Sequence, residues 1–97
     1  MTVSREKFLQ TLYEAIEEQT GREAKTITES SPISIVDVEG PGRPQTDPIE
    51  LDALDVLELM MTLEDKLDVE IDDPSEHPVP RTVGELADAI RSVTRFG

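Results

Sequence analysis

Cysteine and tryptophan are absent from this 97-residue chain, and its aromatic side chains are two phenylalanines and one tyrosine. Without cysteine the chain has no disulfide, no thiolate ligand for a metal and no thiol nucleophile, and nothing points to an oxidising compartment. A core with so few rings has to consist of aliphatic side chains, chiefly leucine, isoleucine and valine. This composition favours a helical bundle over a β-sandwich, and the length suffices for one small domain, residues 1–97.

Long apolar runs are also absent. No stretch approaches the roughly 20 apolar residues of a membrane span. The first seven residues, MTVSREK, contain no apolar run typical of a signal peptide. We therefore expect a cytoplasmic protein without a membrane span.

Basic residues are scarce: 9 lysines and arginines stand against 22 aspartates and glutamates, which gives a net charge of −13. Such a surface is a poor partner for nucleic acid or for an anionic membrane. The charge is also concentrated, because twelve acidic residues and a single basic one, Lys66, lie between Asp47 and Glu76. An acidic segment of this kind can serve solubility alone, and it can also steer basic proteins toward the chain.

The usual parts of a catalytic site are missing. The one histidine, His77, has prolines close on both sides, and no serine stands in a nucleophile motif. The acidic run Asp68, Glu70, Asp72 and Asp73 lacks the glycine and the terminal glutamate of a calcium-binding loop. We expect neither an enzyme nor a metal site.

The most regular part of the chain is residues 53–67, whose apolar side chains follow the helical period. One face is an ordinary core stripe, which consists of Val56, Leu59, Met60, Leu63 and Leu67. A second face carries three residues, here called the apolar ridge: Leu54, Leu57 and Met61. The residues interleaved with the ridge are acidic: Asp55, Glu58, Glu64 and Asp65. Because a helix in a small bundle buries only one such face, the apolar ridge predicts a docking surface with an acidic border.

Two further helices are predicted from apolar spacing and capping residues. The first covers residues 4–20, with Ser4 as its N-cap and Gly21 at its end. The last covers residues 82–94, and Thr82 and Glu85 form a capping box at its start.

The segments between these helices are predicted to be loops. In the long loop over residues 22–50, β-branched stretches run extended and place Ile27, Ile33, Ile35 or Val38 in the core. Its second half is rich in glycine and proline, which is typical of turns. Three prolines between residues 74 and 80 leave room only for a loop or a short helix over residues 72–80.

Two stretches carry a family resemblance. Residues 52–59, with the sequence DALDVLEL, and the following 63–71 resemble the second helix of an acyl carrier protein and its end. Residues 82–90, TVGELADAI, are similar to the final helix of that family. The resemblance implies an all-α fold, which is a small bundle of three main helices with a long first loop. A further helix, the third in chain order and short or degenerate, lies before the last main helix. It implies a protein that tethers acyl intermediates on a 4'-phosphopantetheine arm and presents them to biosynthetic enzymes.

The chain departs from the family at the residue that bears the arm. The family has Asp-Ser-Leu at the start of this helix, and the position of the serine is occupied by Ala53. Alanine has no hydroxyl group, so the arm is expected only on a form with serine at position 53. Two explanations stay open: an engineered replacement that holds the protein without its arm, which the intact flanking residues favour, or a naturally arm-less chain that serves as an acidic adaptor or regulatory protein.

The resemblance also implies the partners, which are a phosphopantetheinyl transferase and acyl-transferring or condensing enzymes with basic patches. The expected protein is a monomer, and the pathway, fatty acid or polyketide, stays open. Eight residues are the expected contacts: Asp52, Leu54, Asp55, Leu57, Glu58, Met61, Glu64 and Asp65. A lysine in place of Asp55 or Glu58 is expected to weaken partner binding while hardly changing the fold.

Overall fold

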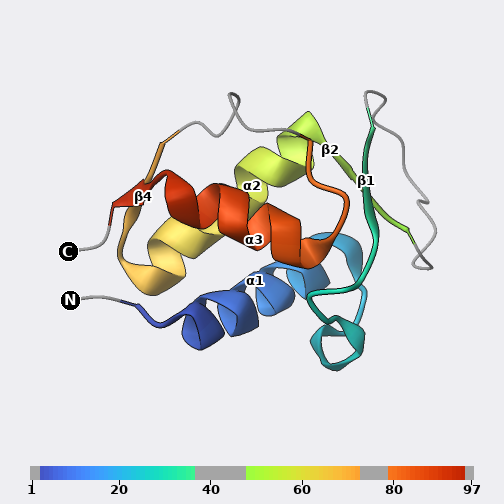
Figure 1. The fold of residues 1–97 in the computed structure, drawn as a ribbon, viewed down its shortest axis with the longest axis horizontal. Coiled ribbons are helices and arrows are strands. Elements are labelled where there is room, and N and C mark those ends of the chain that lie inside the picture. The colour runs from blue at the N-terminus through green and yellow to red at the C-terminus, as the bar shows by residue number, and fades with distance from the viewer. Residues whose placement is uncertain (1–2, 37–47, 73–78, 96–97) are drawn as a thin grey trace.

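The computed structural model describes residues 3–36, 48–72 and 79–95. These residues form a small domain that is mostly helical, with helices α1 (Arg5–Thr20), α2 (Ala53–Leu67) and α3 (Val83–Ser92) (Figure 1). A short 3₁₀ turn, η1 (Ala24–Thr26), follows α1. The three helices predicted over residues 4–20, 53–67 and 82–94 are therefore present, and α2 has the predicted bounds.

The ends of α1 are formed by the residues that the sequence indicates. The hydroxyl oxygen of Ser4 accepts a hydrogen bond from the backbone N–H of Lys7 at 3.1 Å. Gly21 ends the helix in the left-handed region, with φ of 82°, and its N–H donates to the carbonyl oxygen of Glu17 at 2.8 Å. Both contacts satisfy backbone groups that a helix end leaves without a partner.

Four short strands among the described residues make the fold less purely helical than predicted. Strand β1 (Ile33–Val36) pairs in parallel with β2 (Ile49–Asp52), and Ile33 lies opposite Ile49. The stretch from Ile33 was expected to run extended, and it does. Its pairing with β2 was not expected, because the partner is separated from it by the glycine- and proline-rich segment. The prediction of an all-α bundle is therefore too narrow: the domain is mostly helical with a small amount of sheet.

A second pair of strands holds the far ends of α2 and α3 together. Strand β3 (Glu70–Ile71) pairs antiparallel with β4 (Thr94–Arg95). The N–H of Asp72 continues the pair by donating to the carbonyl oxygen of Val93 at 2.9 Å. The last helix ends at Ser92, before the predicted residue 94, because Thr94 and Arg95 pair with β3 instead of continuing the helix.

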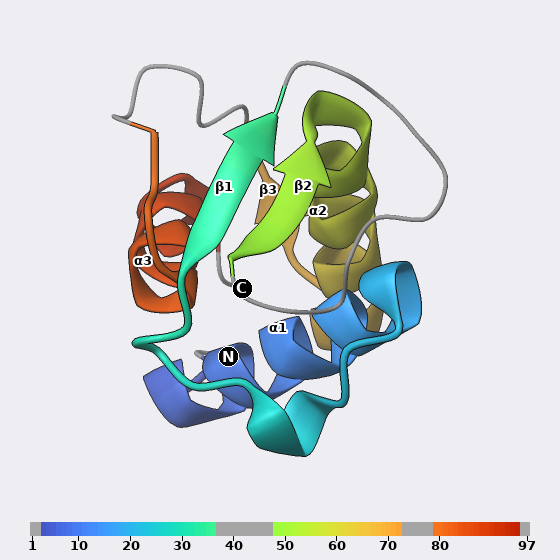
Figure 2. The ribbon, with the colours of Figure 1, turned by 90° about the vertical axis from the view of Figure 1, so that its right-hand side faces the viewer.

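The two strand pairs lie at opposite ends of the helices. The β1–β2 pair lies at the right-hand end of Figure 1, where α2 and α3 begin, and β4 lies at the left-hand end, where they finish. Figure 2 shows β1 and β2 in front of the helices, with α1 at the bottom as in Figure 1. An isolated bridge between Pro32 and Thr82 ties β1 to the start of α3.

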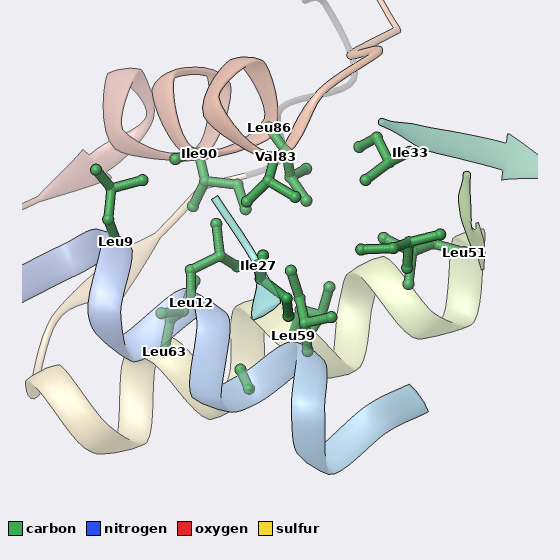
Figure 3. Packing of buried hydrophobic residues seen from close by; sticks show 14 of the residues in the cluster. Leu9, Leu12, Ile27, Ile33, Leu51, Leu59, Leu63, Val83, Leu86 and Ile90 are labelled. Carbon is green, nitrogen blue, oxygen red and sulfur yellow. The ribbon is translucent and has the colours of Figure 1, made fainter. Parts of the chain in front are cut away.

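Side chains from all three helices and both long strands meet in one aliphatic core (Figure 3). Its largest fully buried members are Phe8, Leu12, Ile16, Leu51, Leu59, Leu63, Val83 and Ile90. The extended segment after α1 contributes Ile27 and Ile33, as predicted. Full burial of one such side chain contributes about 1.5–3 kcal/mol, so this cluster is the main source of stability.

A cluster of charged side chains connects the start of α1 with α3 and with the segment that follows η1. The guanidinium of Arg5 lies 2.5 Å from the carboxylate of Glu29 and 3.1 Å from that of Asp88 on α3. The hydrogen bonds to these two carboxylates raise the pKa of Arg5, and the bond from Arg5 lowers the pKa of Glu29.

Three predictions fall outside the described residues: the position of Val38, the loop around His77 and most of the short helix or loop over residues 72–80. Among the described residues, no helix is long and apolar enough to cross a membrane.

Candidate docking face on helix α2

The start of α2 is fixed by two aspartates. Strand β2 runs directly into the helix, and Asp52 is its N-cap. The N–H of Asp55 donates to Asp52 Oδ1 at 2.7 Å, and the N–H of Asp52 donates to Asp55 Oδ2 at 3.0 Å. This reciprocal capping box satisfies two backbone donors of the first turn, where the helix dipole also favours negative charge.

The capping box corrects the predicted docking surface. Only 4% of Asp52 and 7% of Asp55 is exposed to solvent. Both carboxylates accept hydrogen bonds from the backbone within the domain, so they do not form part of an acidic border that a partner touches. A lysine at position 55 would remove the acceptor for the N–H of Asp52, so the structure predicts that this substitution destabilises the start of α2.

The apolar ridge lies on the surface, as predicted. Leu54 is 49% exposed, Leu57 is 48% exposed and Met61 is 58% exposed. Leu59 and Leu63, on the opposite face of the same helix, are 1% and 0% exposed. The helical period produces this division, because residues 54, 57 and 61 recur at spacings of three and four on the face away from the core.

The three remaining carboxylates differ in their freedom to meet a partner. Glu58 and Asp65 are exposed. Glu64 is half-buried, and its Oε2 accepts a hydrogen bond from the N–H of Ile71 at 3.0 Å. Glu64 therefore connects α2 to β3, and the acidic border that faces solvent consists of Glu58 and Asp65.

Sequence reasoning missed one residue at this site, Gln19 near the end of α1. Its side-chain Nε2 donates to Asp55 Oδ1 at 2.8 Å and to Glu58 Oε2 at 2.5 Å. One amide group thus bridges a carboxylate of the capping box and a carboxylate of the acidic border. No local pattern around Gln19 indicates this role, because the contact spans 36 and 39 residues of sequence.

Lys66, the one basic residue in the acidic segment, is turned toward α1. Its Nζ lies 3.6 Å from Glu18 Oε1. An exposed pair of this kind contributes little to stability. It nevertheless pairs the lysine with a carboxylate of α1, which limits the positive charge that Lys66 brings to the α2 surface.

Position 53 is exposed at the first residue of α2, next to the apolar ridge. The methyl side chain of Ala53 offers no oxygen for a phosphodiester, so this chain does not fit a covalent phosphopantetheine arm. The described residues also contain no group of three or more acidic or histidine side chains arranged to hold a metal ion.

Comparisons of the chain with protein-family models, with curated proteins and with solved structures give no match. The site is therefore characterised by its own chemistry. An apolar ridge with two exposed carboxylates beside it is suited to binding a protein surface that has an apolar patch and cations.

Proposed function

We propose that this domain is an acyl carrier protein in an arm-less form, which docks through α2 on biosynthetic enzymes with basic patches. The pattern of residues 52–59 and 82–90 supports this proposal from the sequence. The observation that carries it is the exposure of Leu54, Leu57 and Met61 beside an exposed position 53. A partner that covers the ridge also lies over the position that bears the arm in the resembled family.

Charge and exposed area together determine how this face binds. Burying a whole leucine or methionine side chain contributes about 1.5–3 kcal/mol, and about half of each ridge residue is still exposed, so docking gains about 1 kcal/mol per residue. Glu58 and Asp65 add attraction that salt screens over roughly 10 Å. The expected complex is weak, forms fast and weakens with ionic strength, as a carrier that visits several enzymes requires.

The proposal is tested by restoring the hydroxyl group with Ala53→Ser. The variant is incubated with coenzyme A and a broad-specificity phosphopantetheinyl transferase, and its intact mass is measured. We expect a mass increase of one arm on the variant and none on the unchanged chain. A second variant, Ala53→Ser with Leu57→Asp, should be modified more slowly, because the transferase is the first partner that has to dock on the ridge.

A second candidate, an adaptor that never bears an arm, is favoured by Ala53 itself and by the β1–β2 pair, which the all-α expectation does not contain. If the folded Ala53→Ser variant gains no mass while a basic partner still binds to the ridge, the adaptor is supported and the carrier is rejected. Circular dichroism of the variant establishes that it is folded.

A further inference from the structure

We infer that Gln19 occupies, within the domain, the place that a partner's cation takes on docking, and that it thereby sets how strongly the α2 face attracts basic proteins. The inference rests on the proposed docking function and adds a residue from another helix to it. The bridge from Gln19 to Asp55 and Glu58 carries it.

The chemistry of the bridge resembles that of an ion pair. The amide NH₂ of Gln19 has two donors, and each is aimed at a carboxylate oxygen, at 2.8 Å on Asp55 and 2.5 Å on Glu58. A lysine ammonium or an arginine guanidinium of a partner offers the same kind of donor with a full positive charge. At Glu58, which is exposed, the partner's cation and the amide of Gln19 compete for the carboxylate.

The competition has opposite effects on folding and on docking. A stronger donor at position 19 holds Glu58 against α1, which stabilises the fold and leaves less negative charge for a partner. A side chain of similar shape without donors leaves the two carboxylates unbridged, which destabilises the fold and frees Glu58. Gln19→Lys and Gln19→Met make these two changes.

The matched control is Gln10→Lys. Gln10 is on the same helix and is exposed, and its Nε2 lies 3.5 Å from the carboxylate of Glu14, so the substitution changes the net charge equally beside a carboxylate. Within the part of the chain that the structure describes, no hydrogen bond or ion pair joins Gln10 or Glu14 to α2. A general effect of net charge is therefore the same in both lysine variants, and only Gln19→Lys acts on Glu58.

The probe is a synthetic helical peptide with a leucine face flanked by lysines, labelled with a fluorophore, and its affinity is measured by fluorescence anisotropy at low ionic strength. We expect Gln19→Lys to weaken binding about three- to tenfold and to raise the unfolding temperature by roughly 2–4 °C. Gln19→Met should strengthen binding about twofold and lower the unfolding temperature. Gln10→Lys should change the affinity by less than about twofold.

Two different failures are distinguishable. Equal weakening by Gln19→Lys and Gln10→Lys, or unchanged affinity in both Gln19 variants, overturns the role of Gln19. In that case loss of binding in Leu57→Asp still supports docking on the ridge. If the peptide binds Leu57→Asp as well as the unchanged chain, or fails to bind the unchanged chain, docking on this face is rejected and the role of Gln19 is rejected with it.

Discussion

Replacing Asp55 by alanine tests whether this carboxylate belongs to the fold or to the docking surface. The substitution removes the acceptor for the buried N–H of Asp52 and one of the two acceptors for Gln19. Glu58→Ala is the matched control, because it also removes one negative charge from α2 and one bond from Gln19 but leaves the capping box intact. Any relief of charge repulsion in this acidic domain is common to both variants.

The expected magnitude follows from the partners that are lost. A buried backbone donor without an acceptor costs about 1–3 kcal/mol, and loss of a capping interaction costs about 0.5–2 kcal/mol. These terms overlap, because both describe the first turn of α2, so we expect Asp55→Ala to lower the free energy of unfolding by about 2 kcal/mol. For a domain of this size, that corresponds to a decrease in the unfolding temperature of roughly 8 °C.

The assay is urea and thermal unfolding at neutral pH, followed by circular dichroism at the helical band. Glu58→Ala should lower the free energy of unfolding by no more than about 1 kcal/mol, since the bond it removes is exposed. The reasoning is refuted if the two variants are equally stable, because Asp55 would then act as an ordinary surface carboxylate.

Three further predictions concern other residues. Leu63→Ala should lower the free energy of unfolding by about 2–5 kcal/mol in a urea titration, while Leu57→Ala, on the exposed face, should change it by only about 0.5 kcal/mol; similar losses would contradict the assignment of the two faces. The bond from Arg5 holds the pKa of Glu29 below its ordinary value of 4.5, so the stability it provides is present above that pH and is lost as pH falls through the lower folded-state pKa. Glu29→Gln should therefore be less stable than the unchanged chain at pH 7, with a difference that disappears in acid; a constant difference across this range would show that the charge of Glu29 is not its cause. Gly84→Ala should destabilise the domain despite the better helix propensity of alanine, because the new Cβ lies 3.1 Å from both the Cβ and the carbonyl oxygen of Glu29, and a higher unfolding temperature would show that this loop yields to the added methyl group.

The helices were predictable because their causes are local. The apolar period of residues 53–67 and the capping residues Ser4 and Gly21 are all within a few positions of the structure that they determine. The exposure of the apolar ridge was predictable for a related reason, since a helix with two apolar faces in a small bundle has core on only one side. The ridge is accordingly the part of the candidate site that the sequence identifies best.

The remaining features were harder to predict. Some depend on contacts between segments that are distant in sequence, and others depend on which of two roles a residue has. The pairing of Ile33 with Ile49 is decided by how the chain returns to β1, which the composition of the intervening segment does not encode. Asp52 and Asp55 have the spacing of a capping box, and that spacing was available in the sequence. Acidic residues beside an apolar face are typical of a cap and of a docking surface alike, so the pattern alone does not separate the two roles.

The acidic border of Glu58 and Asp65 affects whether two copies of the domain associate. Without these carboxylates, the exposed leucine and methionine side chains of the apolar ridge would favour association between two copies of the domain. Here every copy also carries the same sign of charge, and at low salt two such molecules repel one another before their ridges touch. We therefore expect the like charge to oppose contact between two copies of this face, while a surface of opposite charge meets no such repulsion.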